Sequence, residues 1–123
     1  IVAYGATMHY SVSAARELAE KHGLRLAVLN VASIKPIDVD AVLKAAETGL
    51  ILTVEDHNPD TGLGARVATV IADAGISCRL IRLGVKTYGL SGKPEDLYRI
   101  EGLDKDGIIA SVLEAQAKGW LKS

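Results

Sequence analysis

Aromatic residues are scarce in this chain of 123 residues. Only 4% of the sequence is aromatic, with four Tyr, one Trp and no Phe, although 49% of it is hydrophobic. The core must therefore be built from Val, Ile, Leu and Ala, a composition typical of layered α/β domains. The single cysteine, Cys78, excludes an internal disulfide and any metal site made of several cysteines. Because Cys78 lies in an apolar run, we expect a small buried thiol and not a nucleophile.

Long apolar runs and an excess of one charge are missing as well. No apolar run approaches the ~20 residues that a membrane-spanning helix needs, and no signal peptide is apparent. We therefore expect a cytoplasmic protein without a membrane partner. Fourteen Lys and Arg against fifteen Asp and Glu give a formal charge of −1, which argues against nucleic acid as a partner.

Four short runs rich in Val, Ile and Leu predict strands. They are Ile1–Ala6, Leu24–Val31, Leu50–Glu55 and Ser77–Leu83. Their nearly continuous apolar character is typical of strands covered on both faces, and helical patterns separate them. This alternation predicts βαβ crossovers and a parallel sheet. We interpret residues 1–123 as a single domain, and the start inside an apolar run, without Met, indicates a fragment of a longer chain.

The helical patterns carry recognisable starts and stops. Thr7 or Ser11 could cap the first helix, Asp38 the second and Asp104 the last. Gly23 and Gly75 are expected just after the first and third helices. In the first helix, spacing near 3.6 residues predicts a buried stripe of Val12, Ala15, Leu18, Ala19 and His22.

Polar residues that could take part in catalysis or binding follow the strands, at the edge where open α/β sheets bind ligands. Glu55, Asp56 and His57 come directly after the third run. Two carboxylates beside an imidazole could perform acid–base chemistry, with alternation placing Glu55 and His57 on one face. Strand-end carboxylates more often cap loops or pair across interfaces, and we favour that structural role.

A second candidate is a weak anion site at Thr7, Gly62 and Gly64. Gly62-Leu63-Gly64 precedes a helix whose free N–H groups would attract an anion. The dinucleotide fingerprint requires a third glycine where this chain has Val67. A tight turn into the helix explains both glycines and is the favoured interpretation.

Several motifs occur in an order that resembles the C-terminal domain of transketolase. They are Gly5-Ala6-x-x-His9, Ser33-Ile34-Lys35-Pro36-Ile37-Asp38, Ile51-Leu52-Thr53-Val54-Glu55-Asp56-His57, Gly62-Leu63-Gly64, Ser91-Gly92-Lys93-Pro94-Glu95-Asp96-Leu97 and Gly102-Leu103-Asp104. The resemblance extends over essentially the whole chain. It implies a three-layer α/β/α fold whose mainly parallel sheet has four strands here, in the order 2-1-3-4. An additional antiparallel edge strand of the family would lie upstream of Ile1.

The resemblance also implies a biochemical setting. Transketolases are homodimers that hold thiamine diphosphate and Mg²⁺ between a pyrophosphate-binding and a pyrimidine-binding domain, and they transfer a two-carbon ketol unit between sugar phosphates of the pentose phosphate pathway. The GDG…Asn signature for the diphosphate and Mg²⁺ is absent from this sequence. The resemblance therefore places no catalytic, cofactor-binding or metal-binding residue on this chain, and the domain alone is expected to be inactive. Its implied role is packing and assembly, with regulation as an extension of that role.

We expect six strand-end residues to contact the neighbouring domain or the dimer partner: His9, Glu55, Asp56, His57, Ser91 and Gly92. Two alternatives stay open. One is the equivalent domain of another thiamine enzyme, either deoxyxylulose-phosphate synthase or the β subunit of a 2-oxoacid dehydrogenase. The other is a stand-alone regulatory module that binds an anion or a nucleotide.

Overall fold

The computed structural model describes residues 1–32, 36–85 and 94–121, and within residues 94–97 it describes the backbone alone. Ser91 and Gly92 lie outside the described residues. The elements follow one another as β1 (Val2–Ala3), α1 (Thr7–His22), β2 (Leu29–Asn30), α2 (Val39–Ala46), β3 (Leu50–Val54), α3 (Leu63–Ala74), β4 (Arg79–Leu83), α4 (Pro94–Glu101) and α5 (Lys105–Ala117). None of the helices in this described part of the chain is long and apolar enough to cross a membrane.

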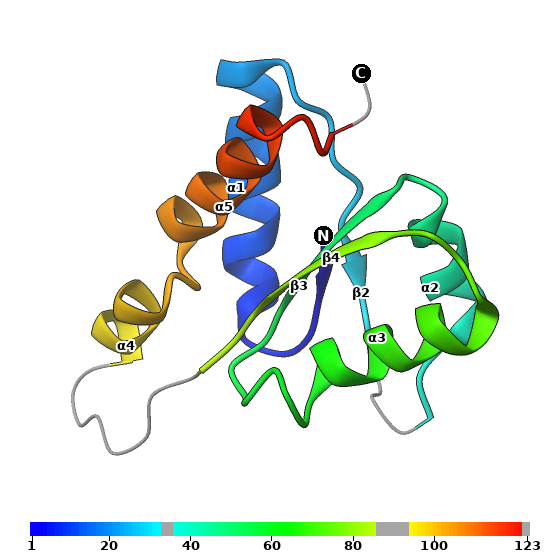
Figure 1. Ribbon diagram of the computed structural model, residues 1–123. Coiled ribbons are helices and arrows are strands. Elements are labelled where there is room, and N and C mark those ends of the chain that lie inside the picture. Colours follow the sequence, from blue (N-terminus) through cyan, green and yellow to red (C-terminus); the bar gives the residue numbers. More distant parts are fainter. Residues whose placement is uncertain (33–35, 86–93, 122–123) are drawn as a thin grey trace.

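The four strands form one parallel sheet in the order β2-β1-β3-β4, which confirms the predicted topology. Helices α2 and α3 cover one face, and α1 and α5 lie side by side on the other, with α4 beside the start of α5 (Figure 1). Strand β2 is added on one side of β1, and β3 and β4 are added on the other, so the strand order reverses between β1 and β3. In a doubly wound sheet, the crevice at this point is where ligands bind.

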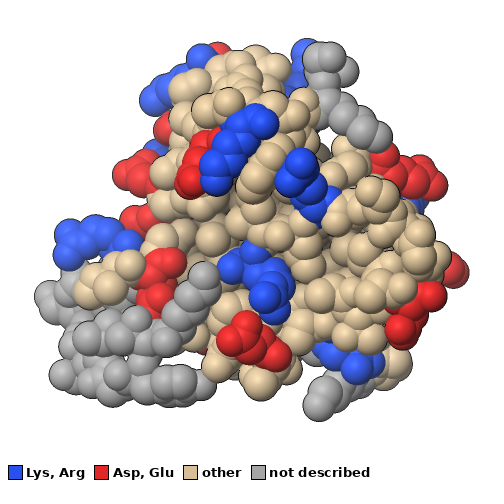
Figure 2. Space-filling model, in the orientation of Figure 1, with Lys and Arg blue, Asp and Glu red and all other residues tan. Residues whose placement is uncertain are grey.

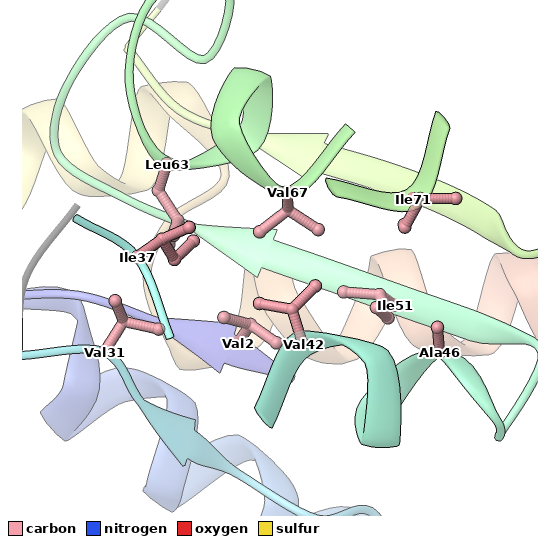
Figure 3. Packing of buried hydrophobic residues seen from close by; sticks show 9 residues of the cluster. All are labelled: Val2, Val31, Ile37, Val42, Ala46, Ile51, Leu63, Val67 and Ile71. Atoms are coloured by element: carbon pink, nitrogen blue, oxygen red, sulfur yellow. The ribbon is translucent and has the colours of Figure 1, made fainter. Parts of the chain in front are cut away.

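Apolar side chains fill the space on both faces of the sheet. On the α2/α3 face, Val2 and Ile51 from the strands meet Val42 from α2 and Val67 from α3 (Figure 3). On the α1/α5 face, Ala3, Leu52 and Val54 pack against Leu18, Leu103, Ile108 and Val112. No phenylalanine is needed because branched aliphatic residues from three layers interlock.

Helix α1 buries a different stripe from the predicted one. The side chains facing the core are Thr7, Ser11, Ala14 and Leu18, whereas Val12 is 40% exposed. Hydropathy alone misled the prediction, because the two buried hydroxyl groups bond to backbone carbonyls. The Ser11 hydroxyl donates to the Thr7 carbonyl at 2.9 Å. Small polar residues can thus occupy a closely packed face without an unsatisfied group.

The helix caps confirm two of the three predicted starts. Asp38 accepts a hydrogen bond from the Ala41 N–H at 3.1 Å, and Asp104 accepts one from the Gly107 N–H at 2.9 Å. Capping of α1 by Thr7 or Ser11 was wrong, since Ala6 is the N-cap and makes no side-chain bond. Gly23 and Gly75 end α1 and α3 with φ of 66° and 68°, the left-handed conformation that glycine adopts without strain.

Candidate functional site

The carboxyl ends of β1 and β3 are tied together at the point where the topology switches. The Tyr4 N–H donates to the Val54 carbonyl at 3.3 Å. The buried Thr7 hydroxyl lies 2.9 Å from both the Tyr4 and the Val54 carbonyl oxygens and can donate to either. Thr7 therefore links the two strand ends, and its hydroxyl forms its hydrogen bonds with backbone carbonyls of the domain itself.

Glu55 is the first residue after β3 and is completely buried. Its two carboxylate oxygens each accept one backbone hydrogen bond, from the Leu63 N–H at 2.8 Å and from the Gly64 N–H at 2.7 Å. These N–H groups open α3, where the helix dipole favours a negative charge. Burial raises the pKa of Glu55, and the two backbone bonds partly oppose that effect.

Neither glycine at this turn has room for a Cβ, because neighbouring groups approach both of them closely. A Cβ on Gly62 would collide with Glu55 Oε1. A Cβ on Gly64 would lie 2.9 Å from Arg82 Cδ and 3.1 Å from the Pro59 carbonyl oxygen. The tight-turn interpretation of Gly62-Leu63-Gly64 therefore accounts for both residues through close approach of neighbouring groups.

Asp56 and His57 lie outside this buried contact. Asp56 Oδ1 is 3.6 Å from His57 Nε2, and the two side chains are 32% and 59% exposed. Strand alternation does not extend to these residues, because β3 ends at Val54, and Glu55 is buried whereas the His57 side chain is largely exposed. The structure thus divides the cluster into a buried helix cap and an exposed pair.

One aromatic ring lies near the exposed pair, and a separate group of rings packs around the start of α1. The Tyr4 and His57 ring centroids are 6.4 Å apart. His9 packs edge-on against Tyr10 at 5.4 Å, and Tyr10 packs in the same way against Tyr98 of α4 at 5.3 Å. The sequence pointed to the two histidines but not to the three tyrosines. Proximity of Tyr10 to Tyr98 depends on how α4 returns to α1, and no local sequence pattern encodes it.

The weak anion site at Thr7, Gly62 and Gly64 has its donors already engaged. The Gly64 N–H donates to Glu55 and the Thr7 hydroxyl lies against backbone carbonyls, so an external anion would have to displace the carboxylate. Among residues 1–32, 36–85 and 94–121, no three His, Cys, Asp or Glu side chains are arranged to hold a metal ion. The anion site at Thr7, Gly62 and Gly64 stays a prediction, and it requires an anion that displaces the Glu55 carboxylate.

Charges of both signs lie close together on the surface. Figure 2 shows basic and acidic groups interspersed over the visible face. Examples are the pairs Arg82–Asp60 at 3.5 Å and Lys118–Glu114 at 3.0 Å. Such exposed pairs contribute little stability individually, about 0–1 kcal/mol.

Comparison with known proteins assigns the family. The sequence matches the family described as transketolase, C-terminal domain, over residues 1–108. The chain belongs to this family. The resemblance inferred from the motifs is therefore confirmed, and the transketolase C-terminal domain accounts for the β2-β1-β3-β4 sheet with helices on both faces.

Individual relatives are considerably longer than this chain. One of the subunits of apulose-4-phosphate transketolase from Phocaeicola vulgatus is 39% identical over 115 residues, which cover 93% of this chain and 36% of the relative. Mus musculus transketolase is 37% identical over 122 residues, covering 97% and 19% respectively. 1-Deoxy-D-xylulose-5-phosphate synthase 1 from Geobacter sulfurreducens is 38% identical over 114 residues, covering 90% and 18%.

A solved structure supports the same assignment. A split-gene transketolase, described as an inactive beta4 tetramer, superposes with a TM-score of 0.85 at 31% identity. The match covers 93% of this chain and 37% of that one. The chain thus spans between about a fifth and somewhat over a third of the relatives it matches.

Proposed function

We propose that this chain is the C-terminal domain of a transketolase and serves in packing and assembly. The complete enzyme transfers a two-carbon ketol unit from a ketose phosphate to an aldose phosphate, using thiamine diphosphate and Mg²⁺ held by its other domains. The cofactor supplies the carbanion chemistry, and the protein binds and orients it. Family membership over residues 1–108 supports this proposal.

The main support for a packing role is that the Glu55 carboxylate binds the start of α3 within the fold. Both of its carboxylate oxygens accept backbone N–H bonds at 2.7–2.8 Å in a completely buried setting. A catalytic acid or base must reach the proton that it transfers, and Glu55 reaches only the start of α3. One of the two carboxylates in the Glu55-Asp56-His57 cluster therefore shapes the edge of the sheet.

What the edge offers to a partner is an exposed polar and aromatic surface. Asp56 and His57 project from the loop after β3, and His9 with Tyr10 follows β1. Tyrosine and histidine side chains bring large contact areas with polar ends, and aromatic residues are enriched at binding hot spots. We infer that this surface, together with Ser91 and Gly92, contacts the pyrimidine-binding domain or the second subunit of a homodimer.

The proposal is tested with the complete protein. Purified enzyme with thiamine diphosphate and Mg²⁺ should convert a ketose phosphate and an aldose phosphate into products that differ from them by two carbons. The relative from Geobacter sulfurreducens supports a second candidate, synthesis of 1-deoxy-D-xylulose 5-phosphate. Mass analysis of the products separates the two, and formation of neither product would reject both.

The contact surface is tested by two substitutions in the same protein. Asp56→Ala and His57→Ala should weaken association of the subunits or domains by about tenfold, which equals 1.4 kcal/mol. Folding should be preserved because both side chains are partly or largely exposed. Asp73→Ala, an exposed position on α3, is the matched control. Unchanged association and an unchanged kcat in both variants would limit these residues to a local role.

A further inference from the structure

Strand β4 forms an open edge of the sheet. It pairs with β3 on one side, and the described part of the chain places no strand on its other side. The strand passes across the front of the sheet in Figure 1. An open edge of this kind presents backbone groups to which another extended chain can add.

The hydrogen bonds of β4 show which backbone groups face outward. The Arg79 N–H donates to the Gly49 carbonyl at 3.0 Å, and the Leu83 carbonyl accepts a bond from the residue that follows β3 at 3.2 Å. The register between the two strands is continuous from Arg79 to Leu83. Because backbone groups alternate in direction along a strand, the N–H and C=O groups of Leu80 and Arg82 face away from β3.

The charged side chains of β4 are both arginines. Arg79 is exposed, and its guanidinium lies 4.6 Å from the centroid of the Trp120 ring. The Lys118 ammonium lies 4.7 Å from the same centroid. Arg82 pairs with Asp60, whereas no carboxylate among the described residues pairs with Arg79. The edge therefore offers a positive charge whose acidic partner would have to come from outside the described residues.

The end of α5 holds the Trp120 ring in this position. Gly119 follows the helix with φ of 74°, the left-handed conformation that favours glycine. The Trp120 N–H then donates to the Ala115 carbonyl at 3.0 Å, which closes the helix end. The ring, and the arginine that lies over it, are therefore positioned by the backbone of α5.

A hollow of about 130 Å³ lies beside the same edge. Ile81 of β4 forms one wall, and residues of α5 and the chain after it form the rest: Ser111, Glu114, Ala115, Lys118 and Trp120. Ile81 and Arg79 point to the same face of the sheet because they are two residues apart. A cavity of about 150 Å³ can hold a benzene ring, so this hollow has room for one aliphatic side chain.

We propose that the edge of β4 binds an extended, acidic segment of a second polypeptide by strand addition. The outward groups of Leu80 and Arg82 supply backbone hydrogen bonds. A carboxylate of the added strand lies next to Arg79, and an aliphatic side chain next to Ile81 enters the hollow. The proposal goes beyond the proposed function, because it uses none of the residues assigned above to the contact surface.

Charge favours this occupant over a second copy of the chain. Pairing of β4 with β4 of another copy would bring the two arginines of each strand to one joint, and like charges on neighbouring strands are destabilising. Positive side chains on sheet edges commonly prevent such self-association. An acidic segment reverses the sign of the interaction.

Three fluorescent peptides test the proposal with the complete protein. Ser-Glu-Thr-Val-Thr-Glu-Ser reads the same in both directions, so it fits a parallel or an antiparallel orientation, and fluorescence anisotropy should show saturable binding. The peptide with Lys in place of both Glu should bind at least about tenfold more weakly. The peptide with Pro-Pro-Pro in place of Thr-Val-Thr keeps the charges but lacks the central backbone N–H groups, and it should not bind.

A charge reversal and hydrogen exchange locate the binding site. Arg79→Glu should weaken binding of the acidic peptide at least about tenfold and should make the lysine peptide the tighter ligand. Arg16→Glu, at an exposed position on α1, is the matched control and should change neither affinity. At saturation, the Leu80 and Arg82 amides should exchange at least about tenfold more slowly than without peptide.

Two results would overturn the proposal. One is equal affinity of the acidic and lysine peptides. The other is protection of the Leu80 and Arg82 amides in the complete protein before any peptide is added, because a second copy or a segment of the same polypeptide would then cover the edge. None of these measurements depends on ketol transfer.

Discussion

Carboxylates cap the starts of α2, α3 and α5, but the carboxylate at α3 comes from a distant residue whereas those at α2 and α5 are local. Each helix begins with backbone N–H groups that have no partner within the helix. Asp38 and Asp104 satisfy one such group each from the N-cap position, three residues away from the donor. Glu55 satisfies two groups at the start of α3 from eight and nine residues away.

The difference connects local and tertiary structure. An N-cap aspartate stabilises its own helix whatever the sheet does. Glu55 instead fixes α3 to the end of β3 and fixes the path of the loop between them. The carboxyl edge of the sheet therefore depends on one buried side chain, whereas α2 and α5 start independently of it.

The largest effect is expected from Glu55→Ala. The substitution leaves the buried Leu63 and Gly64 N–H groups without their acceptor, which should cost about 3 kcal/mol of folding stability. Sulfate should restore part of this loss, because it can bind the freed helix start. Urea unfolding with and without sulfate measures both effects. Glu20→Ala, at an exposed position on α1, is the control, and an equally small loss in both variants would contradict the cap.

Gly64→Ala should have the next largest effect. The new Cβ would lie 2.9 Å from Arg82 Cδ and 3.1 Å from the Pro59 carbonyl, and we expect a loss of about 2 kcal/mol. Shortening the neighbour, in the double variant Gly64→Ala with Arg82→Ala, should recover part of the loss, because the backbone contact with Pro59 remains. A double-mutant cycle of unfolding free energies checks this coupling, and strictly additive losses would argue against the contact.

The local caps should matter less. Asp38→Ala and Asp104→Ala should each lower the unfolding free energy by about 1 kcal/mol. The matched controls are Asp40→Ala and Asp106→Ala, which lie in the first turns of the same helices. These controls should lose only about 0.3–1 kcal/mol through the helix dipole. Thermal unfolding compares the four variants, and losses as large as that of Glu55→Ala would remove the distinction between local and tertiary caps.

The smallest expected effect is on the pH dependence of folding stability. Burial raises the pKa of Glu55 above its unfolded value, so the folded state binds this proton more readily. Its contribution to stability is then fully present below about pH 4.5 and declines as pH rises through the folded pKa. Glu55→Gln should remove this decline, which urea midpoints between pH 4 and pH 7 would show as a flatter profile. A profile parallel to that of the parent chain would assign the slope to other groups.

These contrasts also explain how far the sequence could predict the structure. Asp38 and Asp104 were identified correctly because a cap depends on residues three positions apart. The strand order followed from the family resemblance. The role of Glu55 depends on where the chain turns after β3, and the buried Ser11 depends on a bond to the Thr7 carbonyl. The Tyr10–Tyr98 contact joins residues far apart in sequence, which no periodic pattern encodes.

The most direct test of the account is a reconstitution of ketol transfer. The remainder of the complete protein, prepared without residues 1–123, is assayed with thiamine diphosphate and Mg²⁺ before and after addition of this chain. The account predicts no transfer by the chain alone, weak transfer by the remainder, and recovery when the two assemble. Ketol transfer by the 123-residue chain alone would contradict the proposal that this domain packs against a catalytic centre formed by other domains.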